Sequence, residues 1–151
     1  MHRITTMLIV WCAILLFAFA ALAQPSPRKF KVIAFFNGMS DKAYISFVRE
    51  ANEWFGKVAA DNGFDYEATS DWSRLNAEVL SQYQVVLFLD TRPEKAEQRE
   101  AFQKYMEGGG AWMGFHFAAF ALTPSQFPQN WDWYHSEFLG AGSYVSSALA
   151  G

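Results

Sequence analysis

The chain has 151 residues, enough for one domain. Its formal net charge is only −3 and no long run of like charges occurs, which argues against a nucleic-acid-binding protein. Phe, Trp and Tyr make up 18% of the residues, and such side chains supply bulky core material as well as walls for a ligand cleft.

Residues 1–23 are typical of a secretory signal peptide. His2 and Arg3 give a short positive start, Met7–Ala21 is an apolar run, and Ala21-Leu22-Ala23 is a small-residue cleavage site. The run is short for a bilayer span, which needs about 20 residues, so cleavage after Ala23 is favoured over an uncleaved membrane anchor. We therefore expect a secreted or periplasmic protein with no stable membrane insertion after cleavage.

The single cysteine, Cys12, lies inside this peptide. The mature chain then has neither a disulfide nor a thiol nucleophile. Residues 24–29 follow as a proline-containing linker, and residues 30–151 form the predicted domain.

Apolar patterning predicts three elements in the first half of the domain. Phe30–Phe36 is an apolar block typical of a buried strand, and Asn37–Asp41 follows as a loop. From Lys42 to Asp61 apolar residues recur at spacings of three and four, which indicates an amphipathic helix that Asn62-Gly63 ends. Phe64–Thr69 alternates in polarity and predicts a half-exposed strand.

The second half continues the alternation of strands and helices. Ser70–Leu80 predicts a short helix or turn, and Val85–Leu89 a buried strand. A surface helix is expected over Lys95–Met106, and the glycines Gly108–Gly110 are too flexible to continue it. Ala111–Phe115 then predicts a second buried strand.

This order predicts an α/β fold with a doubly wound, flavodoxin-like, mostly parallel sheet and helices on both faces. After His116 the regularity fades, and the aromatic segment Asn130–Leu139 is interpreted as a loop. Four strands make a thin sheet for this architecture. We therefore expect the C-terminal part of the domain to be truncated, without later strands that would complete the sheet and its site.

Ligands of parallel sheets bind beyond the carboxyl ends of the strands. Asp90, Thr91 and Arg92 follow one predicted strand, and His116 follows another. These residues therefore fall where chemistry is expected. An imidazole there can serve as acid, base or ligand near neutral pH.

The chain resembles the ThuA-like, or trehalose-utilisation, family, which adopts the class I glutamine-amidotransferase-like fold. The resemblance covers about Lys31 to Ser147. The residues that carry it are KVIAFF (Lys31–Phe36), NGFDYEATSDWSRLN (Asn62–Asn76), YQVVLFLDTRP (Tyr83–Pro93), EGGGAWMGFHFAAFAL (Glu107–Leu122) and NWDWYHSEFLGAG (Asn130–Gly142).

The resemblance implies a role in carbohydrate utilisation, on a disaccharide or an oxidised (keto) sugar. Glutamine amidotransferases present a catalytic cysteine where this chain has His116, and an imidazole cannot form the thioester, so glutaminase activity is excluded. Relatives usually carry a histidine near Tyr44, which takes its place here. We assign His116 and Asp90 as catalytic candidates, and as substrate-binding candidates Arg92, Asn37, Tyr44, Trp131, Trp133 and His135.

Each candidate has a structural alternative. His116 can be a hydrogen-bonded structural histidine, and His135 a surface histidine, the reading we favour. Asp90 and Arg92 can pair with each other or cap the next helix, rather than bind sugar hydroxyls or a carboxylate. The aromatic side chains can close a core instead of stacking on a sugar ring; they are Trp131, Trp133 and Tyr134.

No metal site or cofactor is identified. The two histidines could ligate zinc with Asp90, Asp132 or Glu137, but no tight ligand spacing such as HxxxH occurs. The motifs GxGxxG and GxSxG and the phosphate-binding loop are also absent. The expected partner is a small carbohydrate, with no nucleic acid. The alternative functions are a non-catalytic sugar-binding or interaction module, or a truncated inactive fragment.

Overall fold

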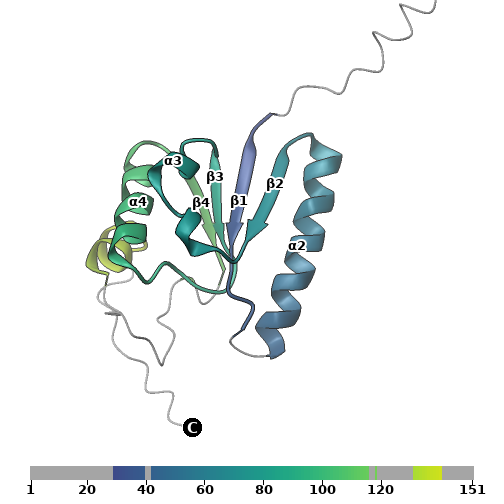
Figure 1. Ribbon diagram of the computed structural model, residues 1–151, viewed down its shortest axis with the longest axis horizontal. Helices are drawn as coiled ribbons and strands as arrows, with labels where there is room; N and C mark the ends of the chain where they lie inside the picture. Colours follow the sequence, from purple (N-terminus) through teal and green to yellow (C-terminus); the bar gives the residue numbers. More distant parts are fainter. Residues whose placement is uncertain (1–28, 40–41, 116–117, 119–130, 141–151) are drawn as a thin grey trace, which may run out of the picture.

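A computed structural model describes residues 29–39, 42–115, 118 and 131–140. Within these residues the fold is a four-stranded parallel sheet in the order β2-β1-β3-β4 (Figure 1). The strands are β1 (Lys31–Phe35), β2 (Asp65–Thr69), β3 (Val85–Phe88) and β4 (Ala111–Gly114). The predicted parallel α/β architecture is confirmed.

One face of the sheet carries the helix α2 (Lys42–Asn62), which stands apart from the other helices in Figure 1. Its residues Val48, Ala51 and Ala59 pack with Val32 and Ala34 of β1 in one apolar cluster. Leu87 and Leu89 join this cluster from β3 and the residue after it. The three-and-four spacing of the sequence thus places the apolar stripe of α2 against the sheet, as predicted.

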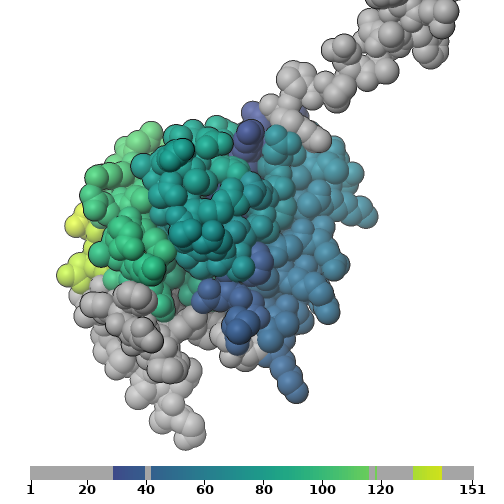
Figure 2. Space-filling view, viewed as in Figure 1, coloured from purple at the N-terminus to yellow at the C-terminus, as the bar shows by residue number. Residues whose placement is uncertain are grey.

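The opposite face carries the remaining helical elements. They are the 3-10 helix η1 (Trp72–Arg74), α3 (Ala77–Leu80), α4 (Ala96–Glu107) and the π-helix η3 (Trp133–Phe138). Phe102 of α4 is fully buried and makes aromatic contacts with Phe88, Trp112 and Tyr134. In the space-filling view, α4 and η3 lie on the side of the molecule away from α2 (Figure 2). The helices therefore cover two faces, as in a doubly wound sheet.

The prediction that Ala111–Phe115 is a buried strand is wrong about burial. Ala111 is exposed, Met113 is 49% exposed, and Trp112 is half-buried. Met113 pairs with Leu87, whose side lies toward the α2 face, and β4 is the last strand in the described sheet order. The strand is apolar on both sides, yet among the described residues only its Trp112 side is covered by helices.

The aromatic segment interpreted as a loop is in fact partly helical. Residues Trp133–Phe138 form the π-helix η3, and the backbone N–H of Leu139 donates to the carbonyl of Tyr134. Trp133 stacks on Phe138 with ring centroids 5.1 Å apart. These rings pack against Phe102 and Trp112. This packing explains the π-helix, which no simple apolar period in the sequence predicts.

Among the described residues, no helix has the length and apolarity needed to cross a bilayer. The predicted signal peptide, residues 1–23, and most of the linker lie outside the described residues.

Candidate functional site

The carboxyl edge of the sheet is organised around Asp90. This residue follows β3 and is completely buried. Its two carboxylate oxygens accept hydrogen bonds from the backbone N–H groups of Asn37 (2.8 Å) and Gly38 (2.6 Å), in the loop after β1. Gly38 has a φ of +66°, a conformation that glycine adopts at little cost. Asp90, at the end of β3, therefore holds the loop that follows the neighbouring strand β1.

Of the two structural alternatives for Asp90 and Arg92, pairing with each other or capping the next helix, the structure contradicts the second. The N-cap of α4 is Lys95, whose backbone N–H donates to the side chain of Gln98. Asp90 is drawn instead to the loop after β1, because β1 and β3 are neighbours in the parallel sheet and end at the same edge.

Trp72 forms a second bridge to the loop after β1. Its indole N–H lies 3.3 Å from the carbonyl of Phe36 and 3.2 Å from the side-chain oxygen of Asn37. The side chain of Gln98 in turn donates to the carbonyl of Trp72 (2.9 Å). The chain before β3 and the first turn of α4 are thus tied to the end of β1 by hydrogen bonds.

A small pocket opens between these bridges. It has a volume of about 130 Å³ and is lined by Asn37, Trp72, Thr91, Arg92, Glu94, Lys95 and Gln98. Of these residues, Arg92 and Thr91 are almost fully buried, with 2% and 3% exposure. The predicted candidates Asn37 and Arg92 therefore line one pocket, and Asp90 accepts a hydrogen bond from the backbone N–H of Asn37.

The charge of Arg92 also acts on the aromatic cluster of the α4 face. Burial raises the pKa of Tyr134, and the positive charge of Arg92 opposes this effect. The Tyr134 hydroxyl donates to the carbonyl of Ala118 (2.9 Å). The phenol of Tyr134 is thus held in its neutral form, inside the apolar cluster on the side of the sheet that carries α4.

The structure places the predicted aromatic platform in the core. Trp131 is 8% exposed and stacks on Tyr134 with ring centroids 4.6 Å apart, and the guanidinium of Arg99 lies 5.5 Å from the Trp131 ring. Burial lowers the pKa of Arg99. Trp133 is half-buried and packs against the same cluster. This arrangement favours the alternative that the aromatic residues close a core over the reading as a sugar-stacking surface.

His135 is not a surface histidine, as the favoured reading had it. It is 2% exposed, and its Nδ1 lies 3.0 Å from the carbonyl of Trp131 in the preceding turn. The nearby acidic residues Asp132 and Glu137 are exposed. In this segment the imidazole of His135 is therefore buried and the two carboxylates are exposed. We interpreted the segment as a loop, and that interpretation does not predict which of its side chains are buried.

Of the two remaining candidates, the structure describes only Tyr44. Tyr44 is half-buried in the first turn of α2, the end of that helix nearest the carboxyl edge. His116 lies outside the described residues; it follows Phe115, whose backbone N–H donates to the carbonyl of Phe88 (3.0 Å). Within the described part of the chain, no three His, Cys, Asp or Glu side chains gather as metal ligands do.

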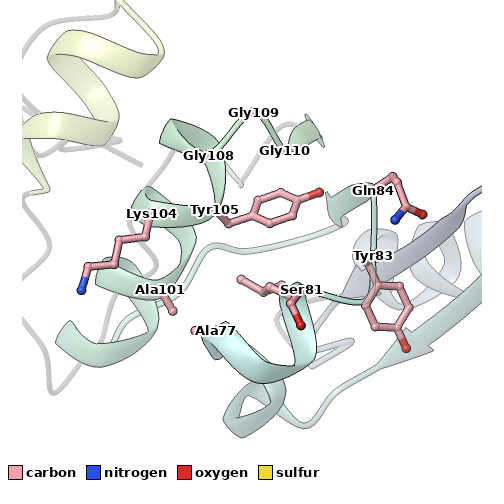
Figure 3. Close-up of a pocket in the computed structure, with 11 residues that line it drawn as sticks. Ala77, Ser81, Tyr83, Gln84, Ala101, Lys104, Tyr105, Gly108, Gly109 and Gly110 are labelled. Atoms are coloured by element: carbon pink, nitrogen blue, oxygen red, sulfur yellow. The ribbon is translucent and has the colours of Figure 1, made fainter.

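A roomier hollow lies at the opposite edge of the sheet. It has a volume of about 430 Å³ between α3, α4 and the starts of β3 and β4, and includes the backbone of Gly108–Gly110 (Figure 3). Figure 3 shows the Tyr105 ring beneath these glycines, and the Tyr105 hydroxyl donates to the carbonyl of Ala111 (3.3 Å). The hollow contains none of the predicted candidates and lies at the amino ends of the strands, where such sheets do not usually bind ligands.

Sequence reasoning missed four residues of the small pocket, namely Trp72, Glu94, Lys95 and Gln98. Gln98 is 6% exposed, and a polar residue on the inner face of a predicted helix was the available signal for it. Trp72 carried no such signal, because its role depends on the position of a loop 35 residues away.

Comparisons with known proteins agree on one family. The sequence profile described as ThuA, trehalose utilisation, matches residues 33–149. Among solved structures, a ThuA-like protein from Bacteroides uniformis ATCC 8492 matches with a TM-score of 0.67 and 32% identity, over 78% of this chain and 46% of that chain. The chain therefore spans less than half the length of this relative. No match was found among curated proteins.

Proposed function

Since this chain belongs to the ThuA (trehalose utilisation) family, we propose that it binds a carbohydrate, a disaccharide or a keto-sugar, at the carboxyl edge of its sheet. The observation that carries the proposal is the pocket between Asn37, Trp72 and Arg92. Its lining offers amide, hydroxyl, guanidinium and ammonium groups. Such groups donate to and accept from sugar hydroxyls and carbonyls.

The size of the pocket limits what it holds. Pockets for whole drug-sized ligands span about 300–1,000 Å³, and this pocket has only about 130 Å³. It therefore receives one edge of a sugar ring, with its hydroxyl or carbonyl groups, while the rest of the ligand lies outside it. In this proposal Arg92 is the buried anchor, and Asn37 and Lys95 are accessible from the mouth.

His116 is the proposed acid, base or ligand of this site. We base this proposal on the position of His116 in the sequence, directly after Phe115, the residue that follows β4 at the carboxyl edge. The same position argues against glutaminase chemistry, because an imidazole cannot replace the thiolate that such enzymes need. Asp90 is the second catalytic candidate, but both its oxygens accept backbone hydrogen bonds, which favours a positioning role.

A calorimetric titration of the 151-residue chain with trehalose, run beside an assay for trehalose breakdown, tests the proposal. We expect saturable binding that weakens about tenfold in Asn37→Ala and in Lys95→Ala, the loss of about 1.4 kcal/mol. The matched control is Lys57→Ala on α2, which should bind as the unchanged chain does. Binding that is insensitive to both pocket variants would contradict this location.

A second candidate function is a sugar-binding module without catalysis. It is favoured by the carboxylate of Asp90, both of whose oxygens are engaged by backbone hydrogen bonds. Binding without turnover, unchanged in His116→Asn, supports the module. Turnover that His116→Asn abolishes supports the enzyme.

We also propose export through residues 1–23, on the basis of their sequence pattern. Expression of the whole chain in a bacterial host followed by mass spectrometry tests this. A mature chain that begins at Gln24 outside the cytoplasm is the expected result, and an uncleaved chain in the membrane fraction would contradict it.

A further inference from the structure

The small pocket at the carboxyl edge presents mainly hydrogen-bond donors to a ligand. Arg92 and Lys95 line it, and neither side chain can accept a hydrogen bond. Thr91, almost fully buried beside Arg92, adds a hydroxyl group that can also donate. Two of these three groups therefore require an acceptor on the ligand, and the third permits one.

The amide of Asn37 adds a further donor to this set. The indole N–H of Trp72 can only donate, so the amide atom that lies 3.2 Å from it is the oxygen of Asn37. This hydrogen bond fixes the orientation of the amide. It leaves the NH2 group of Asn37 as the end that binds a ligand, and that group again donates.

Acceptors beside the pocket are engaged by the protein itself. The side-chain oxygen of Gln98 accepts from the backbone N–H of Lys95, and its NH2 group donates to the carbonyl of Trp72. Both carboxylate oxygens of Asp90 accept backbone hydrogen bonds. A sugar hydroxyl donates as well as accepts, whereas a carboxylate only accepts. A wall of donors therefore suits a carboxylate better than a hydroxyl.

The charges of the pocket favour the same ligand. Among the described lining residues, the cations Arg92 and Lys95 outnumber the one carboxylate, Glu94. Burial lowers the pKa of Arg99, and the charge of Glu94 opposes this effect, so Glu94 also interacts with a cation outside the lining. Lys95 is the N-cap of α4, and the N-terminal end of a helix dipole attracts anions. The pocket thus keeps an excess of positive charge.

The volume of the pocket limits the charged group that it holds. Its space of about 130 Å³ is roughly four times the share of one water molecule in the liquid, ~30 Å³. This space admits a carboxylate and the carbon atoms next to it, while the rest of the sugar ring stays outside.

We propose that the small pocket selects sugar acids, and that Arg92, Lys95 and the NH2 group of Asn37 bind the carboxylate that the sugar ring carries. This inference rests on the carbohydrate site proposed above and specifies the class of sugar. A guanidinium group and a carboxylate are both planar and match each other through two parallel hydrogen bonds, which a neutral hydroxyl cannot form.

Calorimetric titrations of the 151-residue chain with glucuronate and with glucuronamide test the proposal. The two probes share one ring and nearly one shape, and only glucuronate is an anion at neutral pH. We expect glucuronate to bind about tenfold more tightly, since charge-assisted hydrogen bonds are roughly twice as strong as neutral ones. Glucose 6-phosphate should bind more weakly than glucuronate, because the described lining carries only one cation in excess.

Two variants locate this preference in the pocket. Asn37→Asp keeps an acceptor for the indole N–H of Trp72 but adds a second carboxylate, so it should abolish the preference for glucuronate over glucuronamide. Lys95→Met removes one exposed cation and should reduce the preference at least about threefold. The matched control is Lys57→Met on α2, which should leave the preference unchanged. Thermal unfolding shows whether each variant folds, and Lys95→Met alone suffices if Asn37→Asp does not.

The outcomes separate this inference from the carbohydrate site itself. Equal binding of glucuronate and glucuronamide would overturn the inference and leave the carbohydrate site standing. No binding of either probe or of trehalose would contradict both. Tighter binding of glucose 6-phosphate than of glucuronate would assign the pocket to phosphate esters, and a preference that every folded pocket variant retains would place the carboxylate elsewhere; both results would overturn the inference.

Discussion

Asp90 shows how one side chain positions the candidate site. Its carboxylate is fully buried and accepts the hydrogen bonds of two backbone N–H groups after β1, which would otherwise bind water. A buried carboxylate is tolerated only where charge-assisted hydrogen bonds compensate for its lost hydration. Its place after β3 was predictable from the sequence. Its partners were not, because they depend on which strand lies beside β3.

Asp90→Asn should destabilise the fold by about 2 kcal/mol, because an amide offers one acceptor where the carboxylate satisfies two donors. Guanidinium denaturation measures this change, and hydrogen exchange at the Gly38 amide should accelerate. Asp61→Asn, at an exposed position of α2, is the control and should leave the midpoint unchanged. Equal midpoints for all three chains would show that the carboxylate does not hold the loop.

At the level of single elements, the same substitution, glycine to alanine, can be compared at Gly56 and at Gly110. Gly56 lies exposed inside α2, where an added Cβ meets nothing within 4 Å, whereas an added Cβ at Gly110 would overlap the ring of Tyr105. Gly56→Ala should stabilise the protein by about 0.5–1 kcal/mol through helix propensity. Gly110→Ala should destabilise it by about 1–3 kcal/mol through overpacking. Thermal unfolding checks both signs, and a shared sign would contradict the described packing.

Glu67 of β2 is joined to the chain before β3 by hydrogen bonds from Arg74 and Tyr83. The hydrogen bond from Arg74, followed by that from Tyr83, lowers the pKa of Glu67. A carboxylate whose pKa is lowered on folding contributes stability above its unfolded pKa, about 4.3, and this contribution is lost as the pH falls through the folded value.

The melting temperature of Glu67→Gln should therefore lie below that of the unchanged chain at pH 7, and the difference should shrink as the pH is lowered from about 5 to 3. In the Glu67→Gln background, Arg74→Met should add little, because the two residues share one interaction. A difference that stays constant down to pH 3 would argue that the carboxylate does not stabilise β2.

The elements also show how far the sequence predicts this fold. The strand and helix ranges follow from apolar periodicity, and the ends of α2 and α4 differ from their predicted limits by one residue at most. The burial of β4 was mispredicted, because an apolar composition does not tell whether a helix lies over each face. The π-helix was missed since its apolar and polar residues follow neither the strand period nor that of an α-helix.

For the whole molecule, the parallel topology determines which distant residues meet at the site, and the sequence alone does not predict this. The carboxyl ends of β1 and β3 meet at one edge, so Asn37 and Arg92, separated by more than 50 residues, line one pocket. The same topology leaves the aromatic residues around Trp131 inside the layer on the α4 face. Of the residues proposed from the sequence for sugar binding, the pocket therefore retains Asn37 and Arg92.

The most direct test of the carbohydrate site is a nuclear magnetic resonance titration of the isotopically labelled chain with trehalose. We expect the resonances of the indole N–H of Trp72 and of the amides of Asn37 and Gly38 to shift in a saturable manner. The amides of Gly109 and Gly110, beside the hollow at the other edge of the sheet, should stay unchanged. Shifts confined to those glycines, or none at all at saturating sugar, would contradict a carbohydrate site at the carboxyl edge.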